Sequence, residues 1–186
     1  GYSTDISLTA NFMTAVVIGS AVGQWPLGWL SDQIDRRFVL VGISFGGVFV
    51  GGILWLLATE FSETGLILLA ALWGAMAFPI YSISVAHAND RADAGSFVMV
   101  SAGLLLMYGI GAIIGPFIAS TMMSFGSSGI LFLFTCIVHL LLAIYVVSRI
   151  LIRAQPTVLE QKPFSDALAS TQTRSQIFED ALEKEN

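Results

Sequence analysis

The sequence has little charge and almost no cysteine. Only 11% of its 186 residues are Asp, Glu, Lys or Arg, whereas 55% are hydrophobic and the mean hydropathy is +0.81. About 25% of the residues of a typical soluble domain are charged, so the composition excludes that class and indicates a chain that faces lipid. The single cysteine, Cys136, excludes a disulfide framework and a cysteine-based metal site.

Long hydrophobic runs are what the sequence does have. A helix needs about 20 mostly apolar residues to cross a membrane, and its backbone hydrogen bonds must be satisfied within the segment. Five runs meet this length, at 6–30, 38–58, 65–88, 96–123 and 129–151, and their interiors contain no Asp, Glu, Lys or Arg. The sequence therefore predicts an all-α membrane protein, with a transmembrane helical domain over 1–153 and a cytoplasmic, largely disordered tail over 154–186.

The loop charges predict an orientation. All eight basic residues lie on one side of the runs: Arg36 and Arg37 follow the first run, Arg91 follows the third, and the others end or follow the fifth. The opposite connections carry only Glu60 and Glu63. By the positive-inside rule the basic side is cytoplasmic, so we expect an integral protein of the bacterial inner (plasma) membrane with a cytoplasmic C-terminus.

The start of the chain predicts a longer polypeptide. Gly1 opens a polar stretch before the first run, without an initiator Met or a basic signal-peptide start. An odd number of spans with a cytoplasmic C-terminus would leave the N-terminus outside. At least one earlier helix is the simplest explanation.

A charged turn separates the first two runs and reads Gly28-Trp29-Leu30-Ser31-Asp32-Gln33-Ile34-Asp35-Arg36-Arg37. It resembles the cytoplasmic signature of the major facilitator superfamily, a Gly-x-Leu-Ala-Asp-basic-x-Gly-Arg-Arg loop between the second and third helices of each six-helix half. Ser31 replaces Ala, Gln33 takes the basic position and Asp35 takes the second Gly position. These departures resemble the weaker copy in the C-terminal half, which would make the five runs the last five of twelve helices.

The resemblance implies a fold and a function. The fold is a major-facilitator-type helical bundle, present as most of its C-terminal half, and the function is transport of a small solute by alternating access. The implied partners are the solute, the lipid bilayer and the missing N-terminal helices of the same polypeptide, with no nucleic acid, cofactor, metal or catalytic residue. Two alternatives stay open: a membrane sensor or interaction scaffold that does not transport, and an intramembrane enzyme, for which the runs supply only His139.

The charged turn is also the candidate for a cytoplasmic gate. Asp32 can accept hydrogen bonds from an opposing helix N-terminus or pair with Arg91, and Gly28 lets two helix ends approach closely. Such contacts would hold the cytoplasmic side of an alternating transporter closed. The alternative is that Asp32, Arg36 and Arg37 only set the topology at the membrane surface. We expect the stretch 87–93 to be a gating or surface loop.

Polar residues within the runs are candidates for a substrate cavity. We predict that Asn11, Tyr81 and Tyr108 face the solute, although hydrogen bonds between packed helices would explain each of them as well. Pro79 frees backbone carbonyls near mid-membrane, which is acceptable where they line a wet cavity. The runs contain no acidic or basic interior residue, so they permit a neutral, amphipathic or sugar-like solute, and any proton-coupling group is expected outside this chain.

Small residues predict where helices pack. Gly111 and Gly115 form a small-xxx-small face beside Pro116, which predicts close packing together with a bend in the fourth run. The pairs Gly19/Gly23 and Gly47/Gly51 predict helix packing elsewhere. His139, near the centre of the fifth run, is expected to be an interhelical hydrogen-bonding residue.

Overall fold

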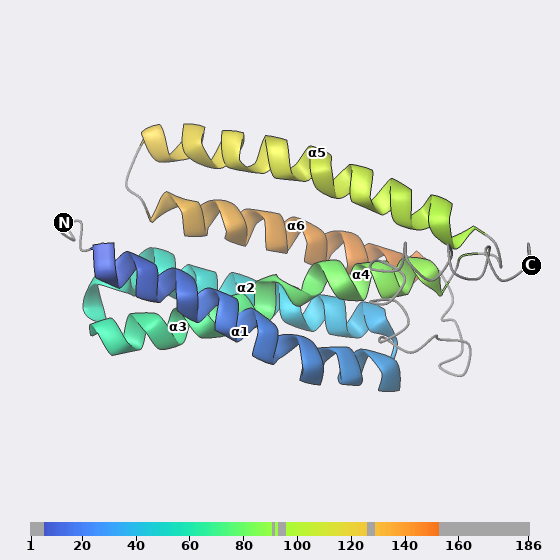
Figure 1. The fold of residues 1–186 in the computed structure, drawn as a ribbon, viewed down its shortest axis with the longest axis horizontal. Helices are drawn as coiled ribbons and strands as arrows, with labels where there is room; N and C mark the ends of the chain where they lie inside the picture. The colour runs from blue at the N-terminus through green and yellow to red at the C-terminus, as the bar shows by residue number, and fades with distance from the viewer. Residues whose placement is uncertain (1–5, 91, 93–95, 126–128, 153–186) are drawn as a thin grey trace, which may run out of the picture.

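The computed structural model describes residues 6–90, 92, 96–125 and 129–152. The tail 154–186 and Arg91, for which the sequence makes predictions, lie outside these residues. The described residues form helices (Figure 1): α1 (Ile6–Gln33), α2 (Arg36–Leu57), the 3-10 helix η1 (Ala58–Glu60), α3 (Glu63–Ala77), α4 (Pro79–Asn89), α5 (Phe97–Ser124) and α6 (Ile130–Ile152). With α3 and α4 taken together, five segments are long and apolar enough to cross a membrane, which confirms the predicted all-α membrane fold.

Pro79 divides the third of these segments into two helices. Proline has no backbone N–H and cannot continue a helical hydrogen-bond ladder, but it fits the first position of a new helix. Accordingly α3 ends with a hydrogen bond of 3.2 Å from the Phe78 N–H to the Gly74 carbonyl, and α4 begins at Pro79. The sequence predicts one helix over 65–88, and the structure has two helices that meet at a buried proline.

Small residues let α1 lie directly on α3. A Cβ atom at Gly19 would overlap the backbone of Ala71, and one at Gly74 would overlap the backbone of Val16. At Gly23 a Cβ would lie 2.8 Å from the side chain of Ala75. A larger residue at any of these glycines would collide with the facing helix, so the glycines permit the close contact between α1 and α3.

The contact between α2 and α6 is built on a second glycine face. A Cβ at Gly47 would overlap the ring of His139, and one at Gly51 would lie 2.9 Å from Cys136 Sγ. His139 Nδ1 lies 2.7 Å from the Thr135 carbonyl of its own helix, and Cys136 Sγ lies 3.4 Å from the Val48 carbonyl of α2. The Nδ1 contact of His139 thus lies within α6, whereas the sequence predicts a hydrogen bond between helices. His139 contributes to the α2–α6 contact by packing its ring against Gly47.

α5 lies apart from the rest of the bundle along one edge (Figure 1). It contacts α6 and α4, and most of its apolar side chains are exposed. A Cβ at Gly111 or Gly115 would meet no atom within 4 Å, and the helix continues through Pro116. Among the described residues this glycine face has no helix against it, so the packing role of Gly111, Gly115 and Pro116 stays a prediction.

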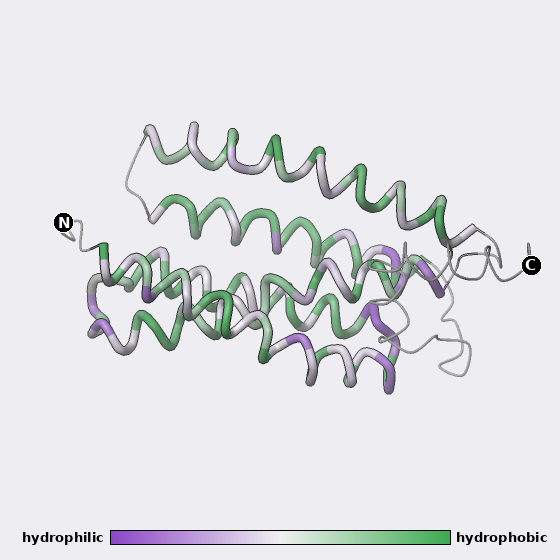
Figure 2. The backbone as a smooth tube through the Cα atoms, viewed as in Figure 1, coloured by the Kyte–Doolittle hydropathy of each residue, from purple (hydrophilic) through white to green (hydrophobic). Residues whose placement is uncertain are grey.

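Strongly hydrophilic residues lie mostly near the two ends of the bundle, and hydrophobic residues cover most of the length between them (Figure 2). One end carries Asp32, Asp35, Arg36, Arg37 and Asp90, where α1 and α4 end and α2 begins. We call it the charged end. The other end carries Glu60 and Glu63 in the connection from α2 to α3.

Candidate functional site

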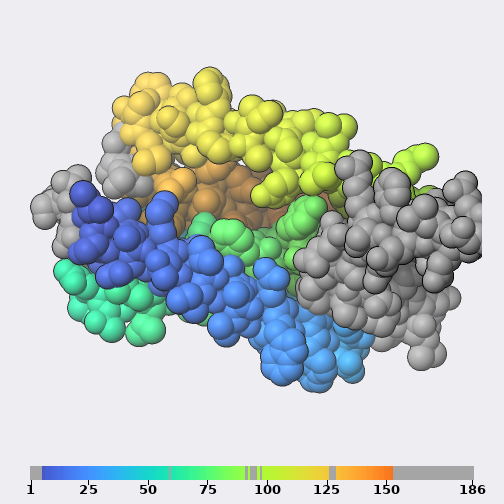
Figure 3. All heavy atoms as spheres, in the orientation of Figure 1, coloured from blue at the N-terminus to red at the C-terminus, as the bar shows by residue number. Residues whose placement is uncertain are grey.

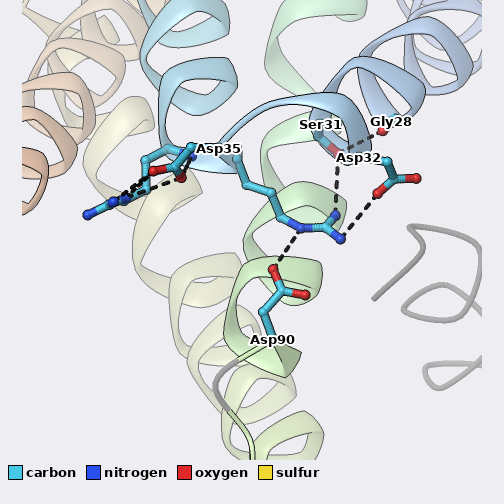
Figure 4. Close-up of polar contacts among 7 residues, drawn as sticks. Gly28, Ser31, Asp32, Asp35 and Asp90 are labelled. Atoms are coloured by element: carbon cyan, nitrogen blue, oxygen red, sulfur yellow. Dashed lines mark hydrogen bonds and ion pairs between the residues drawn. The ribbon is translucent and has the colours of Figure 1, made fainter. Parts of the chain in front are cut away.

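Arg36 joins three helices at the charged end. Its partners Ser31, Asp32 and Asp90 are labelled in Figure 4. Arg36 begins α2, and its Nε donates a hydrogen bond of 2.8 Å to Asp90 Oδ2 at the end of α4. Its Nη2 lies 3.1 Å from Asp32 Oδ1 in the last turn of α1, and its Nη1 lies 3.4 Å from Ser31 Oγ. We call Ser31, Asp32, Arg36 and Asp90 the Arg36 cluster.

The two ion pairs of this cluster differ in burial. The side chain of Arg36 is 0% exposed and that of Asp90 is 4% exposed, whereas Asp32 is 27% exposed. A buried charge is tolerated only with a close partner, and removing that partner costs far more than breaking a surface pair. Asp90 is therefore the partner on which the buried guanidinium chiefly depends, and Asp32 is the partner nearest to water.

Ser31 completes the cluster through a backbone group. Its hydroxyl donates to the Gly28 carbonyl at 2.7 Å, which leaves oxygen lone pairs to accept from Arg36. Ser31 stands at the signature position where alanine is usual, so this contact is available only because of the substitution. Through this contact, the Ser31 hydroxyl connects the Arg36 guanidinium to the last turns of α1.

Arg37, the next residue, belongs to a different cluster. Asp35 caps α2 by accepting a hydrogen bond of 2.9 Å from the Arg37 backbone N–H. The same carboxylate accepts from Arg37 Nε at 2.8 Å and lies 2.7 Å from Nη2. Arg37 Nη1 donates to the Arg149 carbonyl of α6 at 3.5 Å. Asp35 and Arg37, the Arg37 cluster, thus fix the start of α2 and connect it to α6.

Opposing effects set the pKa of Asp35. Burial raises the pKa of this carboxyl. Hydrogen bonds from the Arg37 side chain and backbone, the Arg37 charge and the charge of His87 lower it, and together they hold the pKa of Asp35 below its ordinary 3.8. The carboxylate is therefore ionised near neutral pH and keeps its pair with Arg37.

The structure brings together part of the predicted gate. Gly28, Asp32 and Arg36 meet in one cluster, whereas Arg37 lies in another. Arg91 lies outside the described residues, so its pairing with Asp32 stays a prediction. The sequence does not single out Asp90, and it predicts a gating or surface loop over 87–93. In the structure α4 continues through Asn89, and Asp90 is its C-cap residue. The sequence feature that could have identified Asp90 as a partner of Arg36 is its position at the end of a hydrophobic run on the same side of the membrane as Arg36.

The three predicted substrate residues lie in two places. Tyr81 of α4 and Tyr108 of α5 are in contact, with ring centroids 5.1 Å apart and planes inclined by 55°. Asn11 is exposed in the second turn of α1, near the opposite end from the charged end. The tyrosine pair joins α5 to the rest of the bundle, and the role of all three residues in substrate binding stays a prediction.

A cavity of about 370 Å³ lies at the charged end, and neither Tyr81 nor Tyr108 is among its lining residues. Its walls come from α2, α4, α5 and α6, and its lining residues are Arg37, Leu40, Ser84, His87, Ala88, Leu104, Leu142, Tyr145, Val146 and Arg149. In the part of the chain that the structure describes, no group of three or more His, Cys, Asp or Glu residues could hold a metal ion.

The fold and the charged clusters define a polytopic membrane protein in which buried charges join helix ends. The chain belongs to the Major Facilitator Superfamily, whose sequence profile matches residues 2–182. Membership of this family indicates a role in membrane transport, and it points to a transporter rather than an enzyme.

Named relatives come from enteric bacteria. The chain is 31% identical over 122 residues to the uncharacterized MFS-type transporter YcaD of Escherichia fergusonii. It is 30% identical over 122 residues to the proteins of the same name in Salmonella paratyphi B and Salmonella newport. Each match covers 66% of this chain and spans 30% of the relative's length. No solved structure matches the chain.

Proposed function

We propose that this chain is part of a transporter that moves a small solute across the bacterial inner membrane by alternating access. The observation that carries the proposal is the Arg36 cluster, in which one buried guanidinium binds the ends of α1, α2 and α4. In a member of a transporter family, such a contact is suited to hold one end of the bundle closed.

The charged end is the cytoplasmic end in this proposal, because the basic residues that the structure describes, Arg36, Arg37 and Arg149, lie at that end. With the cluster intact, α4 is held against the ends of α1 and α2 and the cytoplasmic side is closed. Opening requires that Asp90 and Asp32 leave Arg36. Water can replace Asp32 before Asp90, because Asp32 is partly exposed whereas Asp90 is buried.

The solute path lies along α1, α4 and α5. Figure 3 shows α4 and α6 recessed between α1 and α5 on one face. The exposed apolar side of α5 and the open space at Gly111 and Gly115 would be covered by further helices of the transporter, including the N-terminal helices of the same polypeptide. The solute would then pass between the two sets of helices, with Asn11, Tyr81 and Tyr108 facing it.

A transport assay tests this function directly. Uptake and efflux of a panel of labelled neutral, amphipathic and sugar-like solutes would be measured in vesicles that contain the full-length polypeptide, with and without a proton gradient. Protein-free vesicles are the control. Saturable movement of at least one solute is expected. If insertion is verified and no solute moves, the transport proposal is wrong and the sensor or scaffold function takes its place.

A tyrosine variant tests the proposed path once a solute is known. Tyr108→Phe removes only a hydroxyl, and loss of one hydrogen bond worth about 0.5–1.5 kcal/mol would raise KM roughly two- to tenfold. Tyr145→Phe makes the same change on α6, outside the tyrosine pair, and should leave KM unchanged. An equal change in KM for the two variants would show that Tyr108 has no specific role in the solute path.

A further inference from the structure

The cavity at the charged end is lined by basic and apolar side chains. Arg37, His87 and Arg149 supply the basic groups, and no Asp or Glu is among the lining residues. Arg37 is already paired with Asp35. Within the part of the chain that the structure describes, the Arg149 guanidinium has no carboxylate partner, since only its backbone carbonyl is engaged, by Arg37. Among the described residues, Arg149 therefore presents a cation to this cavity with no carboxylate paired to it.

The rest of the wall is suited to a hydrocarbon chain. Leu40, Leu104, Leu142 and Val146 line the cavity beside the basic groups. The outer wall formed by α6 carries many exposed apolar residues, and in a membrane this surface faces acyl chains. A ligand with an anionic head and an apolar body could pair its head with the basic residues and pack its body against the aliphatic side chains.

We propose that this cavity binds an anionic phospholipid, with its phosphate at Arg149 and its acyl chains against the apolar lining residues of the cavity. A guanidinium is suited to this role because its planar fork can donate two parallel hydrogen bonds to phosphate oxygens. His87 and Ser84 of α4 add hydrogen-bond donors on the facing wall. Basic pockets between membrane helices at headgroup depth are the usual setting for such recognition.

The apolar wall favours a lipid over a free anion. Inorganic phosphate entering the cavity would lose hydration against the four aliphatic side chains and gain no contact from them. A phospholipid places these side chains against its own hydrocarbon and keeps the phosphate at the basic groups. The bound lipid would connect α6 to α4 and to α5. Of these helices, α5 makes the fewest contacts with the rest of the bundle.

Lipid retention measured on the full-length protein tests the proposal without any transport assay, so its failure is distinct from failure of the transport function. The protein would be purified in mild detergent with equal amounts of phosphatidylglycerol and phosphatidylcholine, and bound lipids counted by native mass spectrometry. Arg149→Gln should lower the retained ratio of phosphatidylglycerol to phosphatidylcholine about fivefold, the equivalent of about 1 kcal/mol for one basic residue at a charged membrane surface. Arg149→Lys keeps the charge and should retain most of the preference.

Two further experiments test whether the apolar lining residues contribute to binding and whether free phosphate can replace the lipid. Leu104→Trp narrows the cavity without changing its charge and should also reduce phosphatidylglycerol retention. Inorganic phosphate at millimolar concentration should not displace the lipid. Equal retention of the two lipids by the unaltered protein, an unchanged ratio in Arg149→Gln, or displacement by phosphate alone would each overturn the proposal.

Discussion

The two arginine clusters at the charged end are adjacent in sequence and differ in what they connect. Arg36 binds Asp90 and Asp32, which belong to other helices. Arg37 binds Asp35, two residues away, and reaches the backbone of α6. Both arginines are buried, so burial alone does not distinguish them. The difference lies in the partners.

Because of this difference, we expect the Arg36 cluster to be a contact that can open and the Arg37 cluster to be a contact that maintains the fold. α2 and α6 share an extensive contact that includes the glycine face at Gly47 and Gly51, so the Arg37 cluster only adds to an interface that is already closely packed. α1 touches α2 and α4 much less, so at the charged end the Arg36 cluster supplies much of what holds these helices together. We expect the Arg36 cluster to govern opening of the charged end and the Arg37 cluster to govern the stability of the fold.

The largest expected effect is the contrast between Arg36→Gln and Arg37→Gln. Arg36→Gln leaves the buried Asp90 carboxylate without its cation, a change that costs about 3–5 kcal/mol. It should increase labelling of a cysteine at Tyr81→Cys by a membrane-impermeant maleimide, added from the cytoplasmic side, at least tenfold. Labelling would be measured in the full-length protein in a background without other cysteines.

Arg37→Gln is the matched control for this experiment. It makes the same chemical change one residue later, and the Arg37 backbone N–H can still donate to Asp35 and cap α2. We expect lower thermal stability, because the buried Asp35 carboxylate loses its cation. Labelling should stay within about twofold of the unaltered protein, because the partners of Arg36 are kept. Equal labelling of the two variants would mean that the clusters do not have different roles.

Asp32→Asn should have an intermediate effect. Asp32 is partly exposed and Arg36 keeps Asp90 in this variant, so the loss resembles that of a surface ion pair, about 0.2–1 kcal/mol. Labelling at Tyr81→Cys should rise no more than about fivefold. An effect as large as that of Arg36→Gln would show that Asp32, not Asp90, is the main partner.

The smallest expected effect is a pH dependence of stability from Asp35. Because folding lowers the pKa of Asp35 below 3.8, its contribution is fully present above that pH and is lost as the pH falls through the folded-state pKa. The melting temperature of the unaltered protein should exceed that of Asp35→Asn above pH 5, where the Asp35 carboxylate is ionised and paired with Arg37. Scanning fluorimetry in detergent should show this difference shrinking below pH 4. A constant difference would contradict the assignment.

The sequence predicts the helices well because hydrophobic length is a local property. Five apolar runs without interior charge specify five membrane segments, and the signature turn specifies the family. Pro79 shows the limit of this reasoning. Its position in an apolar run is evident from the sequence, but whether a proline bends one helix or starts a new one depends on the surrounding packing.

Partners between helices were harder to predict because they depend on tertiary structure. The motifs at Gly47/Gly51 and Gly111/Gly115 look alike in sequence, yet the first lies against α6 and the second faces open space. Asp90 is equally ordinary in sequence. Its role becomes visible only when α4 is placed beside the start of α2, where its carboxylate reaches Arg36.

A double-mutant cycle on Arg36 and Asp90 tests the central claim most directly. Tyr81→Cys labelling would be measured for Arg36→Gln, for Asp90→Asn and for the two combined. If opening and closing are fast relative to labelling, the rates report the opening equilibrium. The account predicts that the combined variant is labelled little faster than either single variant, with a coupling energy of about 2 kcal/mol or more. Effects that multiply would show that the two residues act independently and would contradict a latch formed by their pair.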